Sequence, residues 1–384
     1  MKDALCLDDI NMKSIIYADN AATTKLDYEV FETMKPFLLD DYSNAFQPYS
    51  FSRGSKKALK KAREDIAECI NASPDEIYFT SGGTESDNWA IKGLVNPNDK
   101  RIFLTSEIEH HAILNTCKAI EKFDYPVKYL PVTRTGVVTP EVLESNITTN
   151  TKLVSIMLVN NEIGTIEPIA ELSKIAHEHG AIFHTDAVQA VGHMPIDVKA
   201  LGIDMLSASG HKFNAPKGIG FLYVRKGLPL SAYENGGSQE FGMRAGTENI
   251  ASIVAMAKAL KLNCEMIPQV HIKLKKMEND FITALKEANV DFIRNGDENH
   301  IPGNINISIK NISGEMLLHR LDLKGICIST GSACDSVNMQ VSHVIKSIGV
   351  PTEYANGTIR ISFGKDNDET DAIKVAQEIV NIIK

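Results

Sequence analysis

Short apolar runs alternate with amphipathic, helix-like stretches through the first 260 or so residues of this chain, and polar clusters follow the apolar runs. The four clusters lie at residues 81–86, 109–111, 160–162 and 186–189. Strands that alternate with helices form mostly parallel, doubly wound sheets, whose ligands bind at the carboxyl ends of the strands. We therefore predict an α/β fold with a binding site at that edge of the sheet.

The hydrophobic period changes near residues 263–268, after a long apolar helix expected at 250–262. A charged helix expected at 273–288 and several short strands follow. The length of 384 residues is sufficient for two domains. We predict a large domain over residues 17–262, and a smaller α+β domain formed by residues 1–16 and 263–384.

Charge and hydropathy limit the partners of the chain. The apolar fraction of 43% and the charged fraction of 23% are typical of a soluble globular protein. A formal charge of −9 argues against a nucleic-acid-binding surface. No apolar run approaches the roughly 18–20 residues of a membrane helix, and the first residues contain acids where a signal peptide needs an apolar core. We expect a cytoplasmic protein that binds neither nucleic acid nor membrane.

The stretch 183–220 contains the most informative set of polar residues. Asp186 follows an apolar run, and Ser209, His211 and Lys212 follow the next one on a turn marked by glycines. A carboxylate can pair with a protonated heteroaromatic nitrogen, the Ser and His can bind a phosphate, and the Lys can form an imine. Taken alone, Lys212 is as well explained as a surface lysine, and Asp186 as a helix cap. Together they indicate a site for pyridoxal 5′-phosphate (PLP).

A second phosphate-binding signal lies at residues 81–86. A strand-like run leads into S-G-G-T-E-S, so a pair of glycines precedes a helix expected to open at Thr84. Glycines let the backbone approach an anion, and the free N–H groups of a helix N-terminus attract it. The G-K-[S/T] of a nucleotide-binding P-loop is missing here.

These motifs belong to a set of eight that occur in an order that resembles the NifS/IscS-like cysteine desulfurases. These are fold-type I PLP enzymes related to the class-V aminotransferases. The resemblance extends from about residue 17 to about residue 383. The motifs are A-D-N-A-A-T-T (18–24), T-S-G-G-T-E-S-D-N (80–88), E-H-H-A (109–112), V-N-N-E-I-G (159–164), D-A-V-Q (186–189), S-G-H-K (209–212), R-A-G-T-E-N (244–249) and S-T-G-S-A-C (329–334).

The resemblance implies a role for each matching residue. It implies that Lys212 holds PLP covalently, that Asp186 keeps the ring nitrogen protonated, and that His110 stacks on the ring and moves protons. Asn161 and Gln189 are expected at the ring hydroxyl. The phosphate ligands that the resemblance implies are Gly83, Thr84, Ser209, His211 and Thr247. Thr247 lies in the Gly-rich loop 236–249, which is expected to reach the active site of the other subunit of a homodimer.

The resemblance also implies the substrate, L-cysteine, with Arg360 and Asn161 binding it. Six cysteines occur, without a C-x-x-C pair, and we predict no metal site. Cys334 lies among Gly, Ser and Ala, as suits an exposed nucleophile on a loop. The implied reaction leaves L-alanine and a Cys334 persulfide.

Two questions stay open at this point. The persulfide is expected to pass to a sulfur-acceptor protein, which serves iron–sulfur cluster assembly through a scaffold, or tRNA or cofactor thiolation. The alternative enzyme is a selenocysteine lyase-like or other PLP-dependent amino-acid lyase, for which Cys334 would be dispensable. A non-catalytic relative is the alternative from another class, although Lys212, Asp186 and His110 argue against it.

Overall fold

The computed structural model describes residues 15–330 and 341–384, so the predicted nucleophile Cys334 lies outside the described residues. The larger of its sheets has seven strands in the order β2-β8-β7-β6-β5-β3-β4. The strands are β2 (Ile77–Thr80), β3 (Ile102–Ser106), β4 (Val127–Leu130), β5 (Thr151–Ser155), β6 (Ile182–Asp186), β7 (Met205–Ser209) and β8 (Gly220–Val224). Six of these strands run in one direction and β8, between β2 and β7, runs in the other, so the prediction of a mostly parallel α/β sheet is confirmed.

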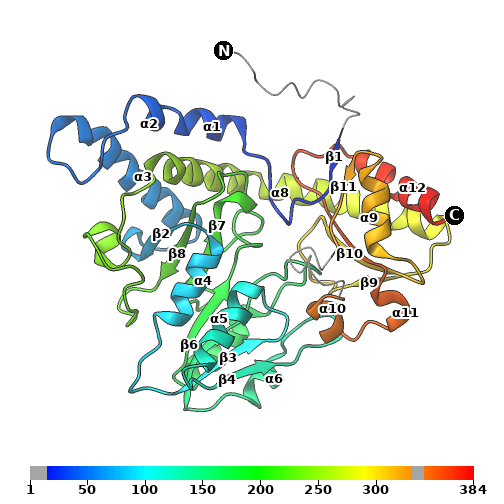
Figure 1. The fold of residues 1–384 in the computed structure, drawn as a ribbon, viewed down its shortest axis with the longest axis horizontal. Helices are drawn as coiled ribbons and strands as arrows, with labels where there is room; N and C mark the ends of the chain where they lie inside the picture. Colours follow the sequence, from blue (N-terminus) through cyan, green and yellow to red (C-terminus); the bar gives the residue numbers. More distant parts are fainter. Residues whose placement is uncertain (1–14, 331–340) are drawn as a thin grey trace.

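Helices cover both faces of this sheet (Figure 1). Side chains alternate along each strand, as the pleat requires. In β8, Phe221 and Tyr223 enter one apolar core, whereas Leu222 and Val224 enter the core on the opposite face. The first core also contains residues of α3 (Arg53–Cys69), α7 (Ile169–Glu178) and α8 (Ile250–Glu287), and the second contains residues of α4 (Gly83–Lys92) and α5 (His111–Glu121).

The C-terminal part of the chain forms a smaller α+β unit with its own core. Its sheet has the order β12-β10-β9 and is antiparallel, and a short parallel pair joins β1 to β11. The strands are β1 (Ile16–Tyr17), β9 (Phe292–Asn295), β10 (Asn304–Ile309), β11 (Ile326–Cys327) and β12 (Thr358–Ser362). Its helices are α9 (Gly314–Asp322), α10 (His343–Ser347), α11 (Thr352–Ala355) and α12 (Asp371–Ile383).

One helix, α8, links the two parts. It is continuous over 38 residues, so the prediction of separate helices at 250–262 and 273–288 is wrong. The predicted change of hydrophobic period near residues 263–268 is also wrong, because buried Ile267, Leu274, Met277 and Phe281 continue the helical spacing, three to seven residues apart. The helix even contains Pro268. The predicted domain boundary at residue 262 falls inside α8, and we retain the division into two domains as a proposal.

Of the remaining helices, α1 (Tyr28–Met34) and α2 (Pro36–Leu39) pack against α8, and α6 (Pro140–Glu144) packs against α7. Across residues 15–330 and 341–384, no helix combines the length and the apolar character that crossing a membrane requires.

Candidate active site

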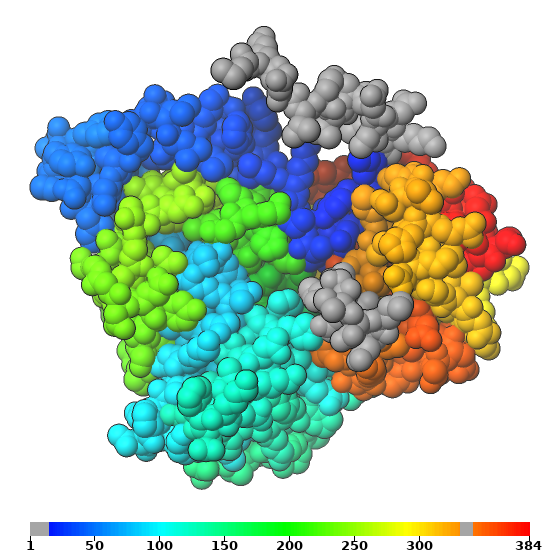
Figure 2. Space-filling model, viewed as in Figure 1, coloured from blue at the N-terminus to red at the C-terminus, as the bar shows by residue number. Residues whose placement is uncertain are grey.

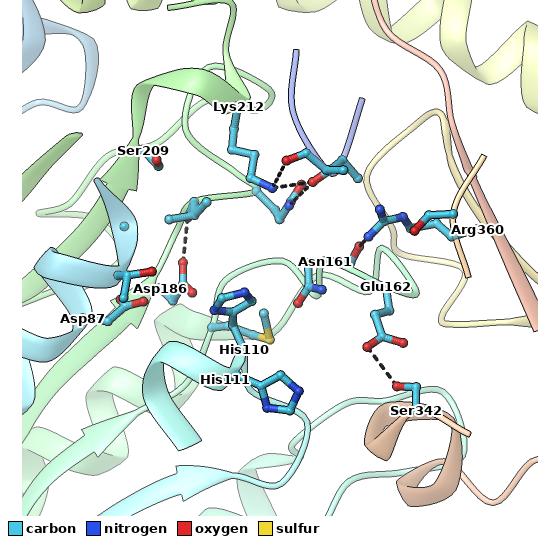
Figure 3. A pocket seen from close by; sticks show the side chains of 18 of the residues that line it. Asp87, His110, His111, Asn161, Glu162, Asp186, Ser209, Lys212, Ser342 and Arg360 are labelled. Carbon is cyan, nitrogen blue, oxygen red and sulfur yellow. Dashed lines mark hydrogen bonds between the residues drawn. The ribbon is translucent and has the colours of Figure 1, made fainter. Parts of the chain in front are cut away.

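A cavity of about 320 Å³ opens at the carboxyl edge of the large sheet. It brings together most of the residues predicted from the sequence, and Figure 3 shows several of them pointing into it. The predicted residues that line it are Gly83, Thr84, His110, Asn161, Asp186, Gln189, Ser209, His211, Lys212 and Arg360.

Lys212 lies where β7 leads into a single 3₁₀ turn, Gly210–Lys212. Its Nζ donates hydrogen bonds to the carbonyl oxygens of Ala21 and of Ala22, the latter at 2.9 Å. Gln189 donates to the same Ala21 carbonyl at 2.9 Å. The segment that contains Ala21 therefore holds the amine and the amide side by side, an arrangement that the sequence did not reveal.

Asp186 is the last residue of β6 and is 5% exposed. Its Oδ1 accepts a hydrogen bond from the Val188 backbone N–H at 2.9 Å. Burial raises the pKa of Asp186 to about 6, against the opposing effects of the Val188 N–H and the Lys212 charge. The carboxylate is therefore mostly ionised at neutral pH and can pair with a cationic ring nitrogen.

The start of α4 has the features of a phosphate cradle. The helix begins at Gly83, and its N-cap, Gly82, offers no side chain to satisfy the first N–H groups. Gly82 has φ +148°, in the region that favours glycine, and a Cβ there would come to 3.4 Å from Ser209 Oγ. His211 completes the cradle, with its Nδ1 3.1 Å from Thr23 Oγ1, and burial lowers its pKa to about 4.

His110 caps the N-terminus of α5, because its Nδ1 accepts a hydrogen bond from the Ala112 N–H at 3.1 Å. This bond places the proton of the neutral ring on Nε2. Burial, followed by the charges of Lys212 and His111, lowers the pKa of His110 to about 4. The residue that faces the cavity is thus a neutral imidazole.

Arg360 approaches from the opposite wall, on β12 of the smaller sheet. It is 7% exposed and donates to the Asn161 carbonyl at 2.9 Å and to Asp19 Oδ1 at 2.7 Å. Its Nε has no hydrogen-bond partner among the described residues. The guanidinium is therefore held in place with donor capacity to spare for a substrate carboxylate.

Two predicted residues are not placed in this cavity. Thr247 is exposed and does not line it. The loop that carries Thr247 is anchored by Glu240, which accepts two hydrogen bonds from Arg63, at 2.8 and 2.6 Å. It is also anchored by Arg244, which binds the Glu85 carboxylate at 2.9 and 3.2 Å. Its contact with a partner subunit remains a prediction.

Cys334 is the second predicted residue that is not placed in the cavity, because it lies outside the described residues. The described segments on either side of it do reach the cavity. Thr330 and His343 both line it. On the C-terminal side, Ser342 donates to Glu162 Oε1 at 2.9 Å and His343 Nε2 lies 3.0 Å from the Glu109 carbonyl. Sequence reasoning overlooked these two anchors, although the V-N-N-E-I-G and E-H-H-A motifs contain both acceptors.

Among residues 15–330 and 341–384, no group of three or more His, Cys, Asp or Glu side chains is arranged to hold a metal ion.

Comparison with known proteins agrees with this geometry. The family model for class-V aminotransferases matches residues 16–375. The chain belongs to the class-V aminotransferase family. It is 48% identical to the cysteine desulfurase IscS of Dictyoglomus turgidum, over 92% of this chain and 90% of the relative. It is 45% identical to that of Methanosarcina thermophila, over 96% and 92%.

Solved structures of class-V relatives superpose on nearly the whole chain. A NifS-like protein matches with a TM-score of 0.91 and 35% identity, over 96% of this chain and 99% of its own. SspA in complex with cysteine matches with a TM-score of 0.82 and 37% identity, over 91% and 98%. These matches confirm the predicted fold type and the resemblance to NifS-like cysteine desulfurases.

The environment of His110 leads to a direct test. Because its pKa is lowered to about 4, the imidazole should stay neutral with the proton on Nε2 between about pH 5.5 and 8. Nitrogen-15 NMR of histidine-labelled protein, with His110→Gln to assign the signal, measures both properties. A titration midpoint near the ordinary value of about 6.5, or a proton on Nδ1, would contradict this description.

Proposed function

We infer that this chain is a cysteine desulfurase that takes sulfur from L-cysteine and leaves L-alanine. The observation that carries the inference is the convergence of ten predicted residues on one cavity at the sheet edge. The identity of 48% and 45% to proteins named cysteine desulfurase, over nine-tenths or more of the chain, supports it.

The residues of the cavity fit PLP as the cofactor. Lys212 would hold it covalently, Asp186 would pair with its ring nitrogen, and the start of α4 with Ser209 and His211 would bind its phosphate. Asn161 and Gln189 would hydrogen-bond its ring hydroxyl. When bound, PLP supplies the electron sink that lets a proton leave the substrate α-carbon.

The protein residues would bind the substrate and manage its protons. Arg360 binds the carboxylate of cysteine, with Asn161 beside it, and so fixes the orientation of the α-carbon. Lys212 and the Nε2 of His110 lie on the cavity wall, where they exchange protons with the substrate. Because its Nδ1 is engaged by the Ala112 N–H, neutral His110 offers its Nε2–H as a proton donor, and Lys212 is the group that accepts the substrate proton.

Sulfur transfer is assigned to the thiolate of Cys334. It attacks the substrate sulfur, an S–S bond forms and the substrate C–S bond breaks. The products are a Cys334 persulfide and L-alanine. The electron pair of the broken C–S bond stays with the substrate carbon, which gains a proton and becomes the methyl group of alanine. No external oxidant or reductant is therefore needed. The anchors at Ser342 and His343 support this assignment, because they fix the chain eight and nine residues beyond Cys334 at the cavity wall.

The fate of the persulfide is a further part of the proposal. We propose transfer to an acceptor protein in the cytoplasm, and an iron–sulfur scaffold is one candidate. Affinity capture with the persulfide-loaded protein, followed by mass spectrometry, identifies the acceptor. Capture of no thiol-bearing protein would contradict this part alone.

We also propose that the enzyme is a homodimer in which Thr247 contacts the phosphate in the site of the other subunit. Large exposed apolar side chains in segment 28–51 support this. Tyr28, Leu39 and Tyr42 are 77%, 65% and 70% exposed, and the ring of Tyr42 packs edge-on against Phe51. Exposed apolar patches usually mark interfaces. Figure 2 shows segment 25–55 and loop 236–249 on the same side of the molecule.

The desulfurase proposal is tested at Cys334. Cys334→Ser should bind PLP and cysteine but release alanine at least about a hundredfold more slowly, because a hydroxyl is a much weaker nucleophile than a thiolate. In the unaltered protein, brief exposure to cysteine should add one sulfur to the Cys334 peptide, as read by mass spectrometry. Cys327→Ser, a substitution at a partly buried thiol seven residues earlier in the sequence, is the control. Unchanged turnover in Cys334→Ser would favour the selenocysteine lyase-like alternative.

The dimer proposal is tested in segment 28–51. Leu39→Glu should convert the dimer into monomers, because it places a charge in a face that the partner would dehydrate. Analytical ultracentrifugation measures the mass. Leu323→Glu is the matched control, since Leu323 is 80% exposed on the smaller unit. A Leu39→Glu variant that stays dimeric would place the interface elsewhere.

A further inference from the structure

Asp87 is a buried carboxyl to which the proposed reaction gives no role. It lies on α4, four residues after the glycine that opens the helix, and it is 1% exposed. It lines the active-site cavity, and Figure 3 shows it beside Asp186. Its Oδ1 has no hydrogen-bond partner among the described residues. An ionised carboxylate in this position would be costly, because burial removes water and nothing replaces it at Oδ1.

The histidine beside Asp87 does not supply a compensating charge. His184 Nε2 lies 3.9 Å from Asp87 Oδ1. Its two ring nitrogens face hydroxyls, with Nδ1 2.8 Å from Ser155 Oγ and Nε2 3.0 Å from Ser207 Oγ. Complete burial lowers the pKa of His184 to about 3, so the ring is neutral at physiological pH. The contact with Asp87 is therefore not an ion pair.

The other groups that face Asp87 push it toward its neutral form. Burial and then the charge of Asp186 raise the pKa of Asp87 well above its usual value, Ser207 opposes the shift, and Glu109 adds to it. Glu109 is itself buried, with its pKa raised to about 8 by desolvation. Asp186, in contrast, accepts a hydrogen bond from the Val188 N–H and is stabilised in its ionised form by the charge of Lys212. Of the two aspartates, Asp186 is better able to hold a negative charge.

We propose that Asp87 is a positioning residue that keeps its proton and thereby confines the single negative charge of the Asp87–Asp186 pair to Asp186. Two ionised carboxylates would repel each other in this dry site, and a proton on Asp186 would remove the partner of a cationic ring nitrogen. The importance of this arrangement for PLP rests on the proposed function. The protonation of Asp87 does not, because it follows from the protein groups alone.

Infrared difference spectroscopy of the full-length protein tests the protonation directly. The spectrum of the unaltered protein minus that of Asp87→Asn at pH 7.5 should show a lost carboxylic-acid C=O band, because Asp87 is neutral. Other neutral acids, such as Glu109, cancel in the difference. Asp204→Asn is the matched control, because Asp204 is equally buried but paired with Arg225 and His177, at 2.6 and 2.8 Å. That difference should show a lost carboxylate band. A carboxylate band lost in Asp87→Asn would overturn the proposal.

The pH dependence of stability is a second test of the protonation of Asp87, for the case in which the infrared bands overlap. The pKa of Asp87 is raised in the folded protein, so Asp87 lowers the free energy of unfolding as the pH rises above the ordinary pKa of Asp. The reason is that the unfolded chain releases the proton over this range and the folded protein does not. The melting temperature of Asp87→Asn relative to the unaltered protein should therefore increase steadily between about pH 5 and 8. A difference that does not change with pH would contradict a protonated Asp87.

The positioning role is tested by PLP binding to the apoenzyme. Asp87→Asn, which keeps a neutral hydrogen-bonding group beside Asp186, should bind PLP to within about threefold of the unaltered protein, because Asp186 remains the ionised carboxylate. A loss of about tenfold or more in Asp87→Asn would contradict the positioning role. Failure of the unaltered protein to bind PLP would instead refute the proposed function, and the infrared result would stand independently.

Discussion

The direction of the strands is the constraint on which the rest of this structure depends. Because β3, β5, β6 and β7 run parallel, their carboxyl ends meet at one edge of the sheet. Each strand can then deliver a different side chain to the same cavity, such as Asp186 from β6 and Lys212 from the turn after β7. The antiparallel β8 pairs with β2, which leads into the start of α4, so the phosphate cradle lies at the same edge.

Burial at this edge then determines the protonation states that the chemistry needs. Desolvation makes His110 and His211 neutral and raises the pKa of Asp186, but the Val188 N–H and Lys212 keep that carboxylate ionised near neutral pH. The smaller unit completes the cavity with Arg360, fixed between Asp19 and the Asn161 carbonyl. The charges in the cavity are thus set by the elements that build its walls.

The alternation of apolar runs and helical stretches predicted the α/β class, because it is a local pattern, and the motifs that resemble the desulfurase family named most of the cavity residues. The sequence did not predict the continuous α8 and suggested a change of period instead, since Pro268 and the charged residues after it obscure a helical spacing that persists. It also missed Asp19 beside Arg360, separated by 341 residues, and Ser342 beside Glu162, separated by 180. Such contacts depend on how the two units pack, which no local pattern records. Asp87 was visible within a motif, but its role depends on three neighbours from other elements.

The central claim is that the carboxyl edge of the sheet holds PLP on Lys212. Reduction of the purified protein with borohydride, followed by proteolysis and mass spectrometry, tests it most directly, because the reduction makes the link between cofactor and lysine permanent. The account predicts a pyridoxyl group on the peptide that contains Lys212 and no comparable amount on any other lysine peptide. A pyridoxyl group on a different lysine, or none in protein supplied with PLP, would contradict it.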